Sequence, residues 1–255
     1  MLFLTSAILM ESRPFLRGWG GRAFKTTVVS SRQLTPSTHG IVLKKPAEFS
    51  FRPVQFTFLG LKADDGLEVR PMSLASSPTR PNLEYGVRLS ESTFKRAFTS
   101  LRPGDDVLVQ GPFGHFVLEE ERPAVFLAGG IGITPLKGMA EYASDKSLPI
   151  EVRLLYSNSS EGEIAYRSEL EELEKQNPQF RVIYTLTGSG VAKGWKGHKG
   201  RIGKRQLQDV ADGLDRPVYY VCGKPDMVAA MVEMLSAASV PDEDIRAEYF
   251  RGYSE

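Results

Sequence analysis

A glycine-rich turn in the second half of the sequence is the segment best suited to hold a phosphate. It follows an apolar run, 124–128, which has the length of a short buried strand. It precedes Thr134-Pro135, where apolar residues begin to recur at helical spacing and proline is well tolerated. A strand, a glycine turn and a helix start together point free backbone N–H groups and the positive helix end at an anion. We therefore expect Gly130 and Gly132 to lie under the phosphates of a dinucleotide; for this segment alone, a tight turn without a ligand is the alternative.

The next apolar run ends in hydroxyl groups. Ser157 opens the sequence Ser-Asn-Ser-Ser directly after the run 150–156. A protein that binds NAD commonly places an acidic residue at this point, where it holds the ribose 2′-hydroxyl. Hydroxyl groups without an acid leave room for a 2′-phosphate, with Arg153 and Arg167 as candidates to reach it. The pattern favours NADPH as the electron donor and leaves NADH open.

The only cysteine, Cys222, ends a further apolar run, 217–222. Open parallel sheets bind ligands at the carboxyl ends of their strands, which favours a place for this thiol in a site. An isolated cysteine is also a common small, buried hydrophobic side chain, so both interpretations stay open.

Two segments of the first half could bind an anion. Arg70 offers a planar, always charged guanidinium that suits a phosphate, and Ser73 follows three residues later. A surface ion pair is the alternative for Arg70. Ser92 is a candidate N-cap of a helix over 93–101, whose free N–H groups could hold a second phosphate.

The elements expected to position these residues fall into two halves of the chain. The first half, 22–118, alternates short β-type runs with turns, which indicates an antiparallel barrel or sandwich. The second half alternates strands with helices, the pattern of a parallel sheet covered on both faces. The expected strands lie at 26–29, 40–43, 54–58, 85–89 and 106–109, then at 124–128, 150–156, 180–186, 217–222 and 245–250, with helices at 93–101, 133–144, 162–176, 204–210 and 225–238.

An acidic stretch that ends in Pro123 separates the halves. We therefore expect domains over 22–118 and 122–255, preceded by an extension, 1–21. The first ten residues of the extension are apolar but too few to span a bilayer. Three interpretations are open for them: a frayed start with Met10 as the true initiator, packing on the body of the protein, and a weak membrane contact.

Composition excludes several classes of function. A net charge of +1 provides no overall field for nucleic acid, and we expect no nucleic-acid partner and no transmembrane span. A single cysteine excludes a disulfide framework and a cysteine-ligated iron–sulfur cluster within the chain, and it fits a reducing compartment, so we predict a cytoplasmic location. The three histidines have no ligand spacing, and no metal site is expected.

Taken in order, these motifs resemble the ferredoxin–NADP reductase superfamily of flavoproteins over most of the chain, from about Lys25 to Tyr253. The resemblance implies a six-stranded antiparallel barrel that binds a flavin and a five-stranded parallel domain that binds NAD(P)H. It rests on Arg70-Pro-Met-Ser73, which matches an Arg-x-Tyr-Ser flavin motif, on Gly111-Pro-x-Gly114, on Gly129-Gly-x-Gly-x-Thr-Pro135, on Cys222-Gly with Met227, and on Glu248 with Phe250 and Tyr253.

The resemblance also assigns roles to residues. FAD is implied rather than FMN, with NADPH or NADH as donor. Met72 stands where the family has tyrosine and Lys95 where many members have serine, so two expected flavin contacts differ. Catalytic roles are implied for Ser73, Cys222 and Glu248; flavin contacts for Arg70, Pro71, Met72, Ser73, Val87, Leu89, Thr93, Phe94, Lys95 and an aromatic residue, Phe250 or Tyr253; and nicotinamide-nucleotide contacts for Gly130, Gly132, Thr134, Ser157, Gly223 and Met227.

The function implied is that of an NAD(P)H-dependent flavoprotein reductase, which passes electrons from its flavin to a ferredoxin-like protein or a small molecule. A non-autonomous electron-transfer subunit of a larger redox complex is the first alternative. A nucleotide-binding or scaffold protein that has lost its flavin is the second, favoured only by Met72. The basic loop 193–201 suits an acidic carrier or a 2′-phosphate, or it is simply a solvated surface loop.

Overall fold

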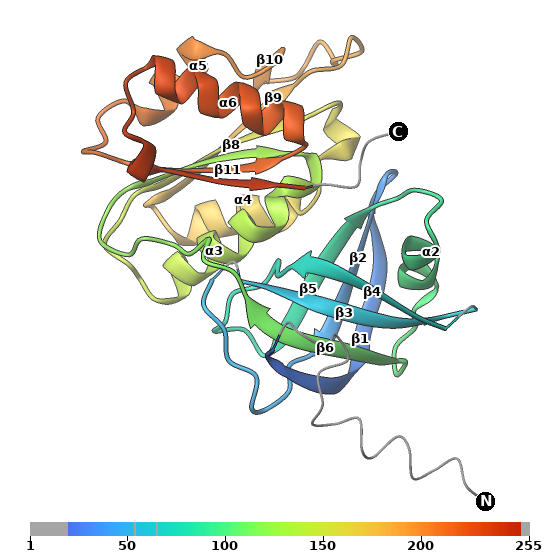
Figure 1. The fold of residues 1–255 in the computed structure, drawn as a ribbon. Helices are drawn as coiled ribbons and strands as arrows, with labels where there is room; N and C mark the ends of the chain where they lie inside the picture. The colour runs from blue at the N-terminus through green and yellow to red at the C-terminus, as the bar shows by residue number, and fades with distance from the viewer. Residues whose placement is uncertain (1–19, 54, 65, 251–255) are drawn as a thin grey trace, which may run out of the picture.

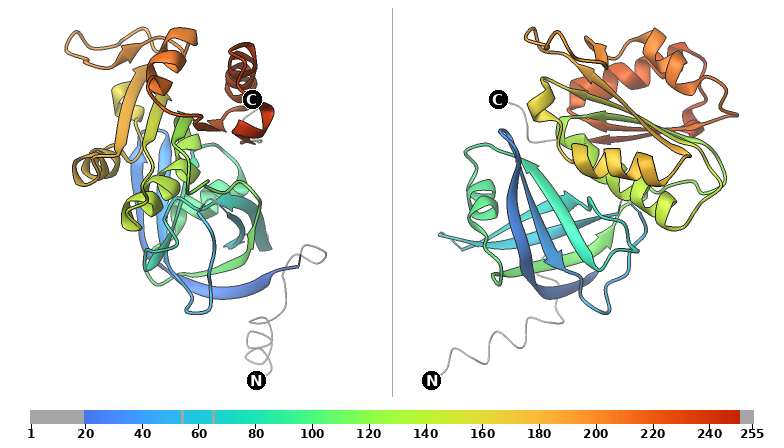
Figure 2. Two further views of the ribbon diagram at one scale, coloured as in Figure 1. Left: turned by 90° about the vertical axis from the view of Figure 1, so that its left-hand side faces the viewer. Right: turned by 180° about the vertical axis from the view of Figure 1, so that it is seen from behind.

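The computed structural model describes residues 20–250 apart from Val54 and Asp65. Within this part, the chain forms two six-stranded sheets, one after the other in sequence. The N-terminal sheet is antiparallel, and the C-terminal sheet is parallel with helices on both faces (Figures 1 and 2). The two-domain class expected from the sequence is confirmed.

The antiparallel sheet has the strand order β4-β3-β6-β1-β2-β5 and curls into an incomplete barrel, with β4 and β5 at its two edges (Figure 2). Its core consists of inward side chains from the strands and from the face of α2 that carries Phe94 and Phe98. The elements are β1 (Arg22–Thr35), β2 (Thr38–Lys44), β3 (Phe56–Ala63), β4 (Gly66–Ser73), β5 (Asn82–Arg88), α2 (Thr93–Ser100) and β6 (Asp106–Phe113).

Strand β4 is the one strand of this sheet that the apolar pattern did not indicate. It is an edge strand whose residues are all exposed or half-exposed, so it shows no alternation of buried and polar residues. The edge position also tolerates Pro71, which cannot donate a backbone hydrogen bond. Strand β4 carries Arg70 and Ser73, two of the residues that the resemblance assigns to the flavin site.

The parallel sheet has the order β10-β9-β8-β7-β11-β12. Alternate residues of β7 enter two separate cores: Phe126 packs with α3 and α4, whereas Val125 packs with α5 and α6. The elements are β7 (Ala124–Gly129), α3 (Ile133–Asp145), β8 (Val152–Asn158), α4 (Arg167–Gln176), β9 (Phe180–Leu186), β10 (His198–Lys199), α5 (Lys204–Ala211), β11 (Val218–Gly223), α6 (Pro225–Ala237) and β12 (Ile245–Tyr249).

The prediction of five parallel strands was wrong, because the sheet has a sixth strand, β10. This strand has only two residues, which pair with Thr185 and Leu186 of β9. It lies in a basic, glycine-rich loop without an apolar run, so no pattern marked it. The helix expected over 162–176 begins only at Arg167, because Tyr166 adopts the left-handed conformation (φ 59°) that interrupts a right-handed helix.

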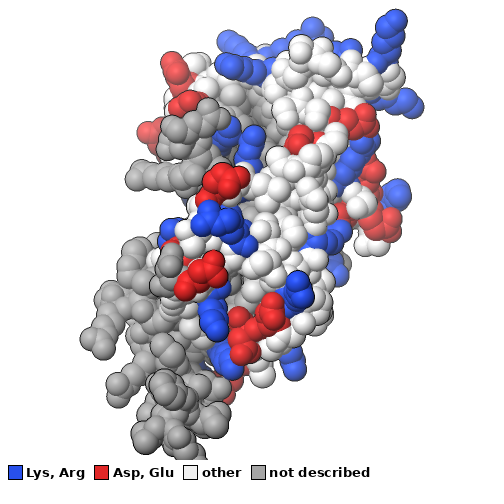
Figure 3. Space-filling model, turned by 90° about the vertical axis from the view of Figure 1, so that its right-hand side faces the viewer, with Lys and Arg blue, Asp and Glu red and all other residues white. Residues whose placement is uncertain are grey.

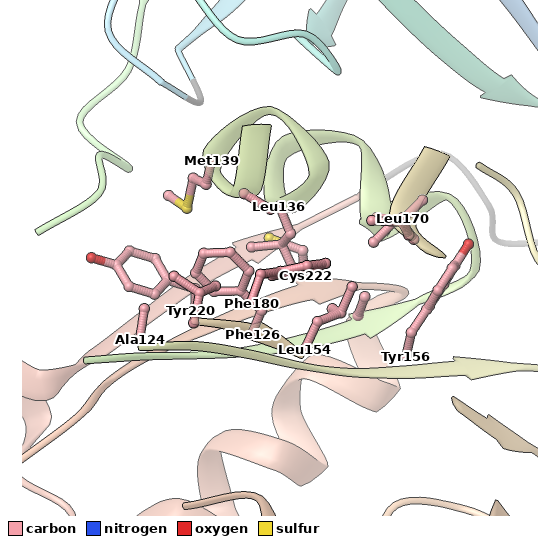
Figure 4. Close-up of a cluster of buried hydrophobic side chains, with 14 of the residues drawn as sticks. Ala124, Phe126, Leu136, Met139, Leu154, Tyr156, Leu170, Phe180, Tyr220 and Cys222 are labelled. Carbon is pink, nitrogen blue, oxygen red and sulfur yellow. The ribbon is translucent and has the colours of Figure 1, made fainter. Parts of the chain in front are cut away.

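Helix α3 packs on both domains. Its apolar face covers the parallel sheet, where Leu136 points toward Phe126 and Cys222 (Figure 4). Its Gly138 lies against the segment that follows β4, so closely that a Cβ atom there would come within 3.0 Å of the Ser76 carbonyl oxygen. Ala75 of the barrel domain belongs to the same buried cluster as this face of the sheet. The helix that begins at the glycine turn is therefore fixed to both halves of the molecule.

Candidate functional site

A hydrogen bond between the two domains brings together the residues expected to carry chemistry. Ser73, the last residue of β4, donates from Oγ to Oε1 of Glu248 in β12 at 3.2 Å, across 175 positions of sequence. Cys222 of β11 stands opposite Glu248 in the parallel register of the two strands. The three residues assigned catalytic roles by the resemblance therefore lie at one junction of the barrel and the sheet.

The Glu248 carboxyl lies in an unusual environment. Burial raises its pKa to about 7, and the hydrogen bond from Ser73 offsets only part of that shift. Its second oxygen, Oε2, is buried and has no hydrogen-bond partner in the described part of the chain. Because a buried polar atom without a partner is costly, this oxygen is suited to meet a polar group of a bound molecule.

The Cys222 thiol is fully buried. Burial raises its pKa well above the ordinary value, and the nearby Glu248 charge acts in the same direction. The thiol is therefore neutral at pH 7, which suits packing or hydrogen bonding rather than attack as a thiolate.

A cavity of about 560 Å³ opens at the carboxyl ends of the parallel strands. Five of the residues expected to contact cofactors line it: Gly130, Ser157, Gly223, Met227 and Phe250. The barrel domain contributes to its wall as well. Arg201, the last residue of the basic loop 193–201, also lines it. Further lining residues, which the sequence did not single out, are Ser37, Thr38 and Arg88 from the barrel and Asn158 and Lys224 from the sheet domain.

The glycines of the turn have different surroundings. Gly130 has a left-handed backbone (φ +52°) and open space where a side chain would lie, so a ligand can approach its backbone. Gly132 is buried against β11, and a Cβ atom there would collide with the Cys222 carbonyl group. Gly132 thus allows α3 to approach the sheet. Thr134 is almost fully buried, and its hydroxyl donates to the Ile131 carbonyl at 3.1 Å.

The barrel residues assigned to the flavin gather around β4 and α2. The Arg70 guanidinium is exposed, pairs with Glu68 at 3.1 Å and lies 5.8 Å from the ring centre of Phe94. Ser92 caps α2 by accepting from the Lys95 N–H at 3.3 Å, as its sequence position indicated. A smaller hollow of about 350 Å³ adjoins this helix start. Leu89, Lys95 and Arg96 are among the residues that line it.

The remaining expected contacts lie nearby or outside the described residues. Pro71 is exposed, and Met72 packs against the barrel core. Val87 is buried in that core, and Thr93 is the half-exposed first residue of α2. Tyr253 lies outside the described residues, as do residues 1–19.

Asn158 is the residue of the cavity wall that sequence reasoning could have found. Its side chain is 5% exposed, and its Nδ2 has no hydrogen-bond partner among the described residues. It stands within the hydroxyl-rich stretch that was noted only for its serines. Ser37 carried no comparable signal, because it faces the cavity only through the docking of the domains, where it hydrogen-bonds Glu163.

Positively charged side chains gather at one end of the sheet domain. Figure 3 shows Lys and Arg side chains gathered along the upper end of the molecule, where Figure 1 places β10 and α5. Exposed cations of this region are Lys193, Lys196, Lys199, Arg201, Lys204 and Arg205. Over residues 20–53, 55–64 and 66–250, no group of three or more His, Cys, Asp or Glu side chains could hold a metal ion. No helix in those same residues is long and apolar enough to cross a membrane.

Comparisons with known proteins agree with this geometry. Residues 126–233 match the oxidoreductase NAD-binding domain family. A ferredoxin NADP+ reductase from Neisseria gonorrhoeae with bound FAD and NADP superposes with a TM-score of 0.76 over 89% of this chain and 98% of that one, at 21% identity. The match extends across the barrel, the sheet and their junction. The chain therefore has the two-domain fold of this reductase, and its second domain matches an NAD-binding domain of oxidoreductases.

The curated relatives that the chain matches are longer proteins. The reductase component of glycine betaine monooxygenase from Pseudomonas aeruginosa is 28% identical over 198 residues, which cover 75% of this chain and 54% of the relative. A component of the Na(+)-translocating NADH-quinone reductase from Klebsiella pneumoniae is 32% identical over 158 residues, 60% of this chain and 39% of the relative. The chain thus spans about half, or less, of the length of these relatives.

Proposed function

We propose that this chain is an NAD(P)H-dependent flavoprotein reductase, with a barrel over 22–118 that holds FAD and a second domain over 122–255 that holds the donor. The observation that supports it best is the Ser73–Glu248 hydrogen bond, which joins the flavin motif to the end of the parallel sheet beside a cavity built from both domains. Two ring systems bound to these two elements would meet at that junction.

The residues present fit these cofactors. Arg70 would bind a flavin phosphate beside the start of α2, and Gly130 offers its backbone to a dinucleotide phosphate. The unpartnered groups of Asn158 and Glu248 would find partners on the donor. When bound, the flavin would take a hydride from the nicotinamide and release electrons one at a time to an acceptor.

The chain itself supplies orientation, exclusion of water and a proton. Glu248, whose pKa is about 7, is available in both protonation states near neutral pH. Its protonated form could donate a hydrogen bond through Oε2 to a polar group above the junction. The fully buried Cys222, opposite Glu248 in the strand register, would help to exclude water beneath the site.

The donor is proposed to be NADPH in preference to NADH. Arg201 lines the cavity together with the hydroxyl-bearing residues Ser157 and Thr187. Two acids also line the cavity: Glu163, whose Oε2 already accepts hydrogen bonds from Thr35 and Ser37, and Asp226 in the first turn of α6. A cationic, hydroxyl-lined wall suits a 2′-phosphate better than a 2′-hydroxyl.

The acceptor is proposed to be a separate ferredoxin-like protein or a small molecule, reached in the cytoplasm. The names of the two curated relatives describe components of a monooxygenase and of a quinone reductase, which favours a protein partner. The same names support a second candidate function, an electron-transfer subunit that turns over only within a larger redox complex.

Anaerobic titration of the purified protein with NADPH and with NADH tests the proposal, with the flavin absorbance as readout. Bleaching by one equivalent of either donor is expected, and NADPH should act at lower concentration. A protein that carries no flavin after reconstitution with FAD and FMN would refute the assignment. Size exclusion and turnover of the isolated chain separate a free-standing reductase from a component of a complex.

Arg70→Ala tests the flavin site independently of the donor. Loss of a charge-assisted phosphate contact costs about 1.5–3 kcal/mol, so flavin affinity should fall roughly tenfold to a hundredfold. Arg102→Ala, an exposed arginine just after α2, is the matched control and should keep wild-type affinity. Equal flavin affinity in the two variants, measured by fluorescence titration of the apoprotein, would show that Arg70 does not hold the flavin.

A further inference from the structure

A buried charge cluster connects the helix under the donor site to the segment that follows the flavin motif. Lys137 of α3 is only 3% exposed, and its ammonium lies 2.8 Å from Oε2 of Glu84 in β5. It also lies 2.7 Å from Oε1 of Glu141, one turn later in α3, and donates to the Ala75 carbonyl at 3.3 Å. An ammonium group has three donors, and each has an acceptor here.

Two of these three acceptors, Glu84 and the Ala75 carbonyl, belong to the barrel domain, and the third, Glu141, is hydrogen-bonded to it. The other carboxyl oxygen of Glu141 accepts from the Ser77 N–H at 3.0 Å. The ring of Tyr166, whose centre lies 5.0 Å from the Lys137 ammonium, covers the cluster from the start of α4. The cluster therefore fixes residues 75–77, which begin two positions after Ser73, against α3, which begins one residue after Gly132.

A fully satisfied buried network permits one arrangement of its parts, because any shift leaves a buried charge without a partner. The apolar contacts around it could tolerate a slide of α3 along the barrel more easily. Another ion pair across the domains, Arg32 with Glu169, is different: the Arg32 side chain is 54% exposed and water can replace its partner.

We propose that Lys137 is a positioning residue, which sets the spacing between the flavin site at Ser73 and the nucleotide site at the Gly130 turn. The inference rests on the proposed function of these two sites. Hydride transfer demands close and aligned reacting atoms, and a displacement of about 1 Å can cost about a hundredfold in rate. Lys137 acts through Ala75, Glu84 and Glu141 and touches neither expected ring.

Lys137→Met removes the charge and keeps the length of the side chain. The flavin-loaded variant is expected to bind FAD and donor with near wild-type affinity, whereas the limiting rate of flavin reduction at saturating NADPH falls at least tenfold. Arg32→Met, which also removes an ion pair between the domains, is the matched control and keeps the wild-type rate. A Lys137→Met rate within twofold of wild type would overturn the proposal.

A second readout does not depend on activity. Spin labels on Lys62→Cys in β3 and Glu233→Cys in α6, both exposed positions, report the distance between the domains in the apoprotein, while the buried Cys222 stays unlabelled. Pulsed dipolar spectroscopy should give one narrow distance in the wild-type background and a broader or shifted distribution with Lys137→Met. An unchanged distribution would contradict the proposal.

Two comparisons keep the outcome interpretable. If Lys137→Met does not fold, Glu84→Gln weakens the same cluster while keeping its shape, and a smaller effect in the same direction on both readouts is required. If wild-type protein binds flavin but no donor reduces it, the proposed function fails, whereas the spin-label distances still decide whether Lys137 fixes the domains.

Discussion

At the scale of single residues, the junction is distinguished by the Glu248 carboxyl group, which is buried and only partly hydrogen-bonded. Glu248 is held by Ser73 through one oxygen and is buried at the other. Burial of this kind destabilises the ionised form, and it leaves the protein with a group that changes its protonation near neutral pH. A buried carboxyl group with an unsatisfied oxygen lowers the stability of the fold. The presence of Glu248 at this position therefore argues for a role in ligand binding or proton transfer.

The pH dependence of stability follows from this group. The carboxyl loses its proton near pH 4.5 in the unfolded chain and near pH 7 in the folded protein. The folded state therefore holds the extra proton between these values, and the free energy of unfolding falls as the pH rises through this window. Glu248→Gln has no such proton and should be more stable than wild type above pH 7, by up to roughly 3 kcal/mol.

Urea unfolding of the apoprotein at a series of pH values measures this difference. Glu233→Gln, on the exposed side of α6, is the matched control. A constant stability difference between Glu248→Gln and wild type from pH 4 to pH 8 would contradict the raised pKa of Glu248.

At the scale of elements, the start of α3 depends on the absence of a side chain. Gly132 has an ordinary helical backbone (φ −60°), so any residue could adopt its conformation. Its need for glycine comes from space, because a Cβ atom would meet the backbone of β11 at Cys222 and Gly223. Backbone atoms of a central strand cannot move aside as a flexible side chain can.

Gly132→Ala should therefore destabilise the protein by roughly 1–3 kcal/mol, the usual cost of overpacking. Gly162→Ala is the matched control, because nothing lies within 4 Å of the added atom and its effect should be small. Thermal unfolding of the apoproteins compares the two variants. Equal melting temperatures would mean that α3 shifts without cost.

The β10–α5 region allows a test of the preference for NADPH over NADH. Arg201 lines the cavity, whereas the neighbouring cation Lys204 does not. Arg201→Ala should raise the KM for NADPH about tenfold or more and change the KM for NADH little, because only NADPH carries the 2′-phosphate that the guanidinium would bind. Lys204→Ala should leave both values unchanged. Steady-state kinetics with both donors decide the point, and an equal rise in both KM values would contradict a 2′-phosphate contact.

The sequence predicted those elements whose pattern is local. The strands β7, β8, β9 and β11 contain apolar runs, and the glycine turn with Thr134-Pro135 marks the start of α3. Strand β4 was not predicted because its side chains are exposed or half-exposed and show no alternation. Strand β10 was not predicted because it contains no apolar run and is defined only by its pairing with β9. Contacts across the domains had no local signal at all: neither Glu84 nor Lys137 stands in a motif, and only the docked fold brings them together.

At the scale of the whole molecule, the two domains share buried structure. Ala75 and Leu118 pack in the main core of the sheet domain, and Lys137 pairs with Glu84 of the barrel in the same interface. Separating the domains would expose this apolar surface and break the contacts of Lys137 with Glu84 and with the Ala75 carbonyl.

The apoprotein is therefore expected to unfold in one cooperative transition. Differential scanning calorimetry should show a single peak whose calorimetric enthalpy equals the van't Hoff enthalpy. Two separate peaks, or a calorimetric enthalpy well above the van't Hoff value, would show that the domains melt independently. Lys137→Met is expected to bring the protein closer to that second behaviour.

The placement of α3 in both halves also bears on how such a gene can change. A recombination event that exchanged only the sheet domain would have to import a helix whose residues suit Ala75, Ser76 and Glu84 of the resident barrel. Most crossovers between the halves would then yield a mismatched pair. Gene fusions that yield a folded protein are therefore expected to keep the barrel and the sheet domain together, with the recombination breakpoints outside the two domains.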